Sequence, residues 1–352
     1  MERMGETGMK KQYRETIAGL NRLVEQGIVP GISYALFDHG IEYREVKGYA
    51  EIQPKKEPLR AKMQYDLASL TKVIGTVPVI AIAIQAGKLK LTDPVQKYLP
   101  EFKDSRPTIQ NLLTHTSGIC GYIPHRDELT AKELKQAYLT QQHVDSSLNR
   151  QIKYADVNFL YLGWIAEKIY GQSIQSLIQS QVLDPLRMKE TTFEPLAVNS
   201  VPTEVQAKRG LIRGTAHDPK AYVLGAECGC AGMFSTLDDL LLYSHALIET
   251  NLNGLLDDWM VDQLFKDQTL IPGEHSRSLG WKLLHAVNDR HCIISHTGFT
   301  GTWLILDREE DQGMIVLTNR VHPTAQNYAY LPARDQLYAA YLHEKENAFL
   351  SM

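Results

Sequence analysis

Ser69 and Lys72 are the first residues in the chain whose types and spacing suit catalysis. They lie in the stretch Asp66-Leu-Ala-Ser69-Leu-Thr-Lys72, and no other serine is followed three positions later by a lysine. Three residues apart on a helix, the two side chains share one face. A serine hydroxyl becomes a good nucleophile when a base takes its proton, and a lysine serves as that base when burial or nearby cations keep it neutral. The alternative is a serine that caps a helix, with a surface lysine one turn later.

A second pair, Tyr154 and Asp156, stands just before a stretch of helical period at 157–169. A tyrosine hydroxyl can relay a proton when a nearby cation lowers its pKa. The structural alternative is a buried tyrosine whose hydroxyl is hydrogen-bonded. Asp156 can cap the helix, act at a catalytic site, or do both.

The third stretch is His296-Thr297-Gly298-Phe299-Thr300-Gly301, which lies between two strand-like runs. Its glycines let the backbone approach a ligand closely, and amide groups at a strand edge can hydrogen-bond an acyl group. His296 is a hydrogen-bond donor there in its cationic or its neutral form, although a histidine at a strand end is often structural.

The periodicity of the chain indicates which elements must hold these residues. Strand-like runs occur near both ends, at 31–37, 41–49, 279–285, 291–296, 302–307 and 313–319. Helical period marks the segments 13–26, 70–85, 131–139, 157–169, 174–182, 238–248 and 331–342. Strands at both ends with helices between them predict one antiparallel sheet assembled from the two termini, and the helical stretch is then an inserted lobe.

We therefore expect two lobes. Residues 1–60 and 274–352 would form an α/β lobe around the sheet, and residues 61–273 a mostly helical lobe. A cleft between a sheet and helices is a common position for a ligand, so the active site is expected at the junction of the lobes.

The composition excludes several classes of function. The 352 residues carry 37 Lys and Arg against 41 Asp and Glu, and a net charge of −4 does not favour nucleic acid as a partner. The first residues lack the apolar core of a signal peptide, and no run is apolar enough to span a membrane. We therefore expect a cytoplasmic protein, or an extracytoplasmic one if an export segment was removed.

We expect the four cysteines to be free thiols that bind no metal. They are Cys120, Cys228, Cys230 and Cys292. A protein without an export signal rarely keeps disulfides, and the one-residue spacing of Cys228 and Cys230 does not suit zinc. We expect no metal and no cofactor.

Ser-x-x-Lys, Tyr-x-Asp and His-Thr-Gly, in this order, resemble the three signature motifs of the β-lactamase and penicillin-binding-protein superfamily. Seven longer stretches, at 66–73, 89–100, 112–118, 185–193, 214–221, 231–236 and 318–322, are similar to its class C branch. The resemblance spans about residues 15–342. It implies an α/β (α+β) fold, with a five-stranded antiparallel sheet flanked by helices, an all-helical lobe, and Ser69 at their junction.

The resemblance also implies a role for each catalytic residue. Ser69 would be the nucleophile, Lys72 its proton acceptor, and Tyr154 the relay that protonates the leaving group and activates the deacylating water. Backbone N–H groups of Ser69 and Phe299 would form the oxyanion hole. Losing one such donor costs on the order of 3 kcal/mol of transition-state stabilisation.

The resemblance also implies which residues bind the substrate. His296 and Thr297 would bind its acyl portion or a carboxylate group, and Gly298 and Asp156 would support them. Two of these residues depart from the family pattern. Asp156 stands where asparagine is usual, and its charge would favour the ammonium form of Lys72 and slow acylation at neutral pH. His296 stands where lysine is usual, and it is charged only in part at pH 7, so it would grip a carboxylate less firmly.

These residues favour a serine hydrolase that forms an acyl-enzyme on an ester or amide, like carboxylesterase-like or D-amino-acid peptidase-like relatives. The alternative is a penicillin-binding D-alanyl-D-alanine carboxypeptidase or a class C-like β-lactamase. A third hypothesis is a binding or scaffold protein that keeps the fold without turnover. The expected partners are small ester, amide or peptide substrates, with β-lactams among the candidates, and the sequence leaves the oligomeric state open.

Overall fold

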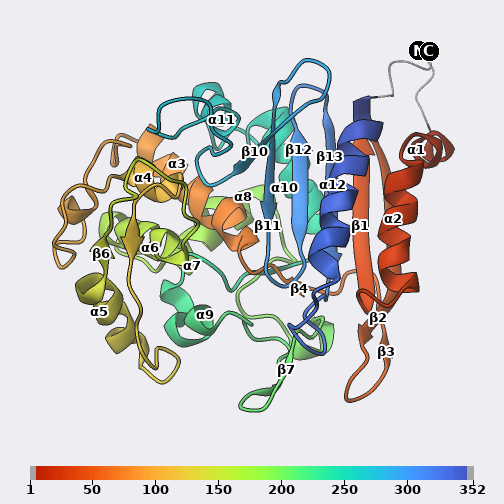
Figure 1. Cartoon of the computed structure of the whole chain (residues 1–352), viewed down its shortest axis with the longest axis horizontal. Helices are drawn as coiled ribbons and strands as arrows, with labels where there is room; N and C mark the ends of the chain where they lie inside the picture. The colour runs from red at the N-terminus through yellow and green to blue at the C-terminus, as the bar shows by residue number, and fades with distance from the viewer. Residues whose placement is uncertain (1–4, 347–352) are drawn as a thin grey trace.

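The chain folds around one antiparallel sheet whose strands come from both ends of the sequence (Figure 1). The structure is a computed structural model and describes residues 5–346. The strand order is β10-β11-β12-β13-β1-β2-β3. Their bounds are Lys282–His285, Cys292–Thr297, Trp303–Asp307, Gln312–Thr318, Gly31–Asp38, Ile41–Glu51 and Glu57–Pro58. The predicted antiparallel sheet of both termini is confirmed, but it has seven strands where the resemblance implied five, because the short strands β10 and β3 extend it at either edge.

Strand β1 joins the two halves of the sheet, because it pairs with β2 on one side and with β13 on the other. All eight of its residues are buried. Alternate side chains point to opposite faces of a strand. Ala35 and Phe37 accordingly join the core that the sheet shares with the inserted helices, while Tyr34 and Leu36 join the core on the outer face.

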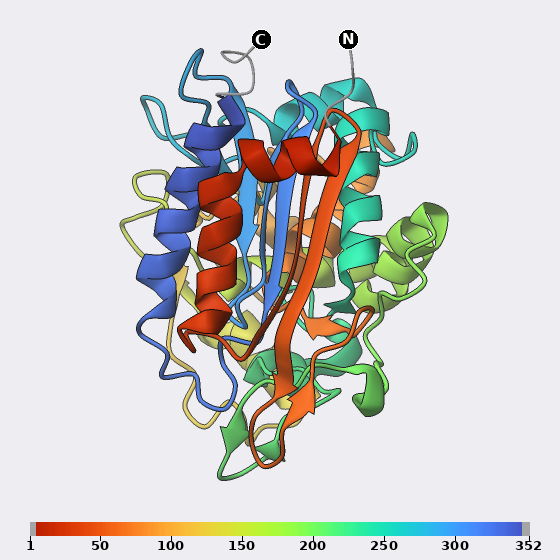
Figure 2. The same cartoon turned by 90° about the vertical axis from the view of Figure 1, so that its right-hand side faces the viewer.

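Three helices cover the outer face of the sheet (Figure 2). They are α1 (Glu6–Gln12), α2 (Arg14–Glu25) and α12 (Tyr330–Glu346). Helices α2 and α12 lie side by side, and they approach so closely that a Cβ on Gly19 would stand 2.6 Å from Leu337. Helices α2 and α12 were both predicted from the sequence. Each packs one apolar face against the sheet, and such a face shows in the sequence as apolar residues three and four positions apart.

The segment between the two groups of strands is mostly helical and covers the inner face of the sheet (Figure 1). Its α-helices are α3 (Val77–Gln85), α4 (Ile109–Leu113), α5 (Ala131–Gln141), α6 (Asp156–Tyr170), α7 (Ile174–Ile178), α8 (Asp184–Leu186), α9 (Pro219–Leu224), α10 (Leu237–Thr250) and α11 (Asp258–Leu264). Three two-stranded sheets accompany them: β4 (Tyr65–Asp66) with β9 (Phe234–Ser235), β5 (Ile119–Cys120) with β6 (His143–Val144), and β7 (Val205–Gln206) with β8 (Gly210–Leu211).

The main strands all fall within the ranges predicted for the α/β lobe, 1–60 and 274–352. The exact division between the two lobes stays a prediction. Within residues 5–346, no helix is both long enough and apolar enough to cross a membrane.

Candidate active site

Ser69 stands on a tight turn between strand β4 and a helix. Ala68, just before it, has a φ of 45°, a backbone region that costs energy for a residue with a side chain. The turn is held by Asp66, whose Oδ1 accepts the N–H of Ala68 at 2.8 Å. A strained residue held by its neighbours is common at functional sites, and here it fixes the position of the serine at the start of the helix.

The helix after Ser69 begins with a π-helical turn, Lys72–Thr76, before α3 continues from Val77. Thr76 Oγ1 donates to the carbonyl of Gly229 at 2.6 Å, which ties this turn to the segment that carries Cys230. π-Turns are rare and occur often at functional sites.

Lys72 is completely buried and uses all three of its N–H donors. Its Nζ lies 2.9 Å from Ser69 Oγ, 2.9 Å from the carbonyl of Cys230, and 2.8 Å from Asp156 Oδ1. The predicted pairing of serine and lysine is therefore present in the structure, and the surface lysine of the alternative is excluded. The three contacts fit an ammonium group.

The charges around Lys72 keep it protonated at rest. Burial acts to lower the pKa of Lys72, but Asp156, followed by Tyr154 and Cys230, holds that pKa well above its ordinary value. Burial likewise acts to raise the pKa of Asp156, but Lys72 and Lys220 hold it well below its usual range. The resting site thus contains an ammonium–carboxylate pair, and Lys72 must release a proton before it can accept one from Ser69.

Asp156 forms ion pairs in the active site and does not cap helix α6. The N-cap position of α6 is Ala155, and the Asp156 side chain makes no cap hydrogen bond. Its two carboxylate oxygens are instead shared between Lys72 and Lys220, the second at 3.1 Å. Two buried ammonium groups compete for the carboxylate more strongly than backbone N–H groups do, so the capping alternative is wrong.

Tyr154 covers the catalytic lysine from the solvent side. The residue is 47% exposed, and Lys72 Nζ lies 5.2 Å from the centre of its ring. The ring packs against His115 at 4.4 Å and lies 6.0 Å from the His296 ring. No group among residues 5–346 hydrogen-bonds its hydroxyl. The alternative of a buried tyrosine with a bonded hydroxyl is therefore wrong, and the hydroxyl is free to meet a substrate.

His296, at the end of β11, is buried and neutral. Burial, followed by the charges of Lys72 and Arg277, holds the pKa of His296 well below its ordinary value. The expectation of partial charge at pH 7 is thus wrong, because that expectation assumed a solvated histidine. Neither ring nitrogen of His296 has a hydrogen-bond partner among the described residues.

The loop after Thr297 brings a backbone edge against the Ser69 turn. A Cβ on Gly298 would stand 2.5 Å from the carbonyl oxygen of Leu67 and 2.3 Å from Thr302 Oγ1, so only glycine fits there. Thr300 Oγ1 donates to the carbonyl of Asp66 at 2.6 Å, and Thr302 Oγ1 to that of Leu67 at 3.1 Å. These contacts fix the loop relative to the nucleophile.

Phe299 and Ser69 supply the two backbone N–H groups expected for an oxyanion hole. Neither N–H donates to an acceptor within the part of the chain that the structure describes. The Phe299 side chain is held between two neighbours, the His217 ring at 5.5 Å and the Arg320 guanidinium at 4.8 Å. Arg320 Nε also donates to the Phe299 carbonyl at 2.7 Å, and this hydrogen bond stabilises the loop.

Three residues of the site were not identified as site residues from the sequence. Lys220, at the start of α9, bonds Asp218 at 2.8 Å as well as Asp156. His115 is buried under Tyr154, and its Nδ1 accepts from Asn158 at 3.0 Å. Arg277 acts electrostatically on both His115 and His296. The motif-like stretches 112–118 and 214–221 contain the first two, whereas no pattern in the sequence singles out Arg277.

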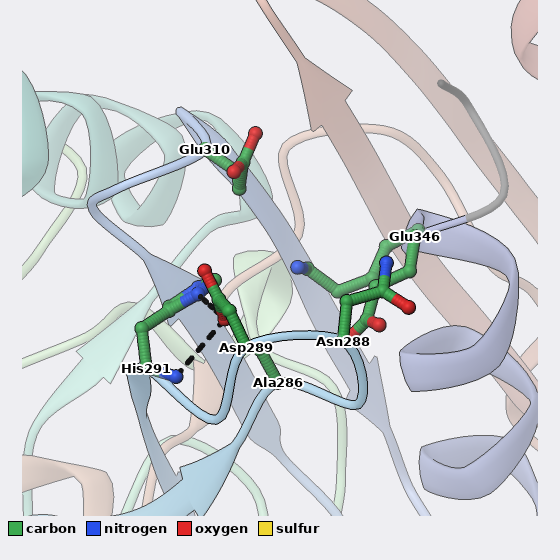
Figure 3. A pocket seen from close by; sticks show the side chains of 7 residues that line it. Ala286, Asn288, Asp289, His291, Glu310 and Glu346 are labelled. Atoms are coloured by element: carbon green, nitrogen blue, oxygen red, sulfur yellow. Dashed lines mark hydrogen bonds and ion pairs between the residues drawn. The ribbon is translucent and has the colours of Figure 1, made fainter. Parts of the chain in front are cut away.

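A separate charged cluster lies at the other end of strand β11 (Figure 3). It lines a cavity of about 40 Å³ and joins the β10–β11 turn to helix α12. His291 is bonded to Asp289 at 2.6 Å and to Asp307 at 2.8 Å, and Lys345 pairs with Asp307 at 2.7 Å. His291, Asp289 and Glu309 have the grouping of metal ligands, but both ring nitrogens of His291 are already bonded to carboxylates, Nδ1 to Asp289 and Nε2 to Asp307. We interpret the cluster as a structural anchor for α12.

Comparisons with known proteins identify the family of the chain. A family model described as Beta-lactamase matches residues 18–338. The chain is 27% identical over 363 residues to an N-acetylmuramyl-L-alanine amidase of Bacillus subtilis, covering 89% of this chain and 82% of the relative. It is also 27% identical over 350 residues to a putative D-alanyl-D-alanine carboxypeptidase of Salmonella typhimurium, covering 82% and 78%.

Solved structures show the same fold. A class C β-lactamase in complex with cefoxitin superposes with a TM-score of 0.75 at 21% identity, covering 96% of this chain and 99% of the other. A second class C β-lactamase gives a TM-score of 0.74 at 21% identity, covering 97% of each chain.

Proposed function

The chain belongs to the β-lactamase family and is a serine hydrolase, and we propose that it cleaves an ester or amide bond through an acyl-enzyme on Ser69. The contact between Lys72 Nζ and Ser69 Oγ, at 2.9 Å, is the observation on which this proposal rests. A hydroxyl and an amine in contact, on a strained turn beside two free backbone N–H groups, form the arrangement that acyl transfer requires.

In the proposed first step, Ser69 Oγ attacks the carbonyl carbon of the substrate. The developing oxyanion accepts hydrogen bonds from the N–H groups of Ser69 and Phe299. The serine proton passes to Lys72 in its neutral form, and the exposed hydroxyl of Tyr154 carries a proton to the leaving group. Water, activated by the same tyrosine, then releases the acyl group and regenerates Ser69.

The ion pair with Asp156 makes this sequence depend on pH. Only the fraction of enzyme with neutral Lys72 can take the serine proton, and Asp156 keeps that fraction small at pH 7. Because the fraction of neutral lysine grows with pH, acylation would be faster in alkaline solution.

The proposed substrates are peptide-type amides and esters. Two relatives carry names of amide hydrolases, an N-acetylmuramyl-L-alanine amidase and a putative D-alanyl-D-alanine carboxypeptidase. These names favour a D-amino-acid peptidase-like or amidase-like activity, with simple carboxylesters as further substrates. The second candidate is a penicillin-binding carboxypeptidase or a β-lactamase, in which the same Ser69 reacts with β-lactams.

Steady-state rates on a small panel test the proposal. The panel contains an aryl ester, an N-acyl-D-alanyl-D-alanine peptide, an N-acetylmuramyl peptide and a chromogenic cephalosporin, each measured with the wild-type protein and with Ser69→Ala. We expect turnover of the ester and of at least one peptide that disappears in the variant. Rapid turnover of the cephalosporin alone would favour the second candidate, and equal rates for wild type and variant would refute both.

A further inference from the structure

A cavity of about 650 Å³ has none of the catalytic residues in its wall. Its lining residues come from three segments, 24–30, 49–56 and 320–329. These are the junction of α2 with β1, the end of β2 with the turn that follows it, and the connection from β13 to α12. We call it the Arg320 cavity, after the arginine that lines it. Its volume lies within the range of about 300–1,000 Å³ that is common for ligand pockets.

Hydrogen bonds between these segments hold the Arg320 cavity in shape. The N–H of Ile52 donates to His322 Nε2 at 3.0 Å. Asn327 Nδ2 donates to the carbonyl of Ile28 at 2.7 Å and to that of Arg320 at 3.0 Å. The wall is therefore formed before a ligand arrives, and a preformed site loses little free energy to ordering when the ligand binds.

Two cations line the cavity, and neither has a carboxylate partner. Arg320 is 6% exposed, and of its guanidinium nitrogens only Nε donates a hydrogen bond within residues 5–346, to the Phe299 carbonyl at 2.7 Å. Lys56 Nζ lies over the Tyr49 ring, 4.0 Å from its centre. No ion pair in the described part of the chain involves either cation, and the lining residues include no aspartate or glutamate. A cation held away from water without a counter-ion is costly, and an anionic ligand would remove that cost.

The rest of the wall is largely apolar and aromatic. Ile28, Ile52 and Pro323 contribute aliphatic surface, and Tyr49 and Tyr328 contribute rings. Tyr328 is 82% exposed, so its ring is available to a ligand. An inorganic anion would leave this surface uncovered, and a neutral hydrocarbon would leave the two cations unpaired. The wall thus suits a ligand that has both a negative group and an apolar body.

We propose that the Arg320 cavity binds an amphipathic organic anion, whose acidic group lies against Arg320 and whose apolar body lies against the rings of Tyr49 and Tyr328. A guanidinium can donate two parallel hydrogen bonds to an anionic group with two oxygens. The same guanidinium bonds the Phe299 carbonyl, so the ligand would touch a residue that holds the loop of the oxyanion hole. This is a second binding site, and it does not depend on the acyl transfer proposed for Ser69.

The test is a fluorescence titration with two dyes that share one aromatic body. Anilinonaphthalene sulfonate is an anion, and N-phenylnaphthylamine is the same ring system without the sulfonate. Arg320→Gln and Lys56→Gln each remove one charge of the cavity, and Lys55→Gln is the control at a neighbouring lysine outside it. We expect one sulfonate dye per chain, with a Kd that rises about 10- to 100-fold in Arg320→Gln and about 2- to 5-fold in Lys56→Gln. Lys55→Gln should leave this Kd unchanged, and the Kd of the neutral dye should change less than about twofold in any variant.

The wild-type protein alone can refute the inference. No saturable binding of the sulfonate dye below about 1 mM, or equal affinity for the two dyes, would overturn it. An unchanged Kd in Arg320→Gln, or an equal rise for both dyes, would do the same. Circular dichroism checks that Arg320→Gln is folded. If it is not, Lys56→Gln decides, because a higher Kd for the sulfonate dye alone supports the site and an unchanged Kd overturns it.

Discussion

The carboxylate of Asp156 holds Lys72 in its ammonium form, with Oδ1 and Nζ 2.8 Å apart, while the same Nζ lies 2.9 Å from the nucleophile Ser69. The group proposed as the base of the reaction is therefore stabilised in the state in which it cannot act as a base. This relationship determines how the rate should depend on pH.

Asp156→Asn should shift the pH profile toward acid. Asp156 raises the pKa of Lys72, so its removal lowers that pKa, and the rise of kcat/KM with pH should move to lower pH. Activity at pH 7 should increase. Stopped-flow acylation rates between pH 5 and pH 10 would measure this, with Asp104→Asn, at a surface ion pair, as the control. An unchanged profile would show that the pair does not govern the base.

Lys220→Met should reduce the stability of the protein. The substitution leaves Asp156 and Asp218 with one cation fewer, and Asp156 then pairs with Lys72 alone. We expect a loss of about 2 kcal/mol in the free energy of unfolding, less than the 3–5 kcal/mol of a fully buried pair because the Asp156 side chain is partly exposed. Lys153→Met, at the exposed pair with Asp145, should cost less than about 1 kcal/mol. Urea unfolding of both variants tests this, and equal losses would contradict it.

Tyr154→Phe should separate activity from stability. The hydroxyl is exposed and unbonded among the described residues, so Tm should change little, whereas turnover should fall by about 10²- to 10⁴-fold with the loss of a proton relay. The matched control is Tyr161→Phe, whose buried hydroxyl donates to the carbonyl of Tyr138 at 2.6 Å. That variant should lose about 1 kcal/mol of stability and keep its activity. Wild-type turnover in Tyr154→Phe would remove the tyrosine from the mechanism.

Gly298→Ala should displace the loop that carries the Phe299 N–H. The new Cβ would collide with the carbonyl oxygen of Leu67, a backbone atom of the serine turn. We expect a fall in kcat of about 10²- to 10³-fold, as for the loss of one oxyanion donor. Gly5→Ala, where a Cβ meets nothing within 4 Å, should leave kcat unchanged. A fully active Gly298→Ala protein would contradict the assigned position of the oxyanion hole.

The sequence predicted the sheet because its strands are periodic and lie at both ends of the chain. It also predicted Ser69, Lys72 and Tyr154 as site residues. The motifs that contain them are short, so each one lies within a single helical turn or at the end of one element. The proximity of Ser69 and Lys72 was expected from their helical spacing, whereas the approach of Tyr154 was an expectation from the resemblance, and the structure brings all three together.

What the sequence could not predict depends on contacts between distant segments. Lys220, on α9, pairs with Asp156, at the start of α6, although the two residues lie far apart in the sequence. The neutral state of His296 follows from its burial near two cations, Lys72 and Arg277, and no local pattern encodes that surrounding. The same holds for the backbone of Arg277, which comes near the site through a bridge to β10.

Covalent trapping tests the central claim most directly. The wild-type protein and Ser69→Ala would be incubated with an activated phosphonate ester, which forms a stable adduct with an acylating serine, and then digested and mapped by mass spectrometry. We predict one adduct per chain, on Ser69, and none on the variant. An adduct on another residue, or equal labelling of the two proteins, would contradict the account.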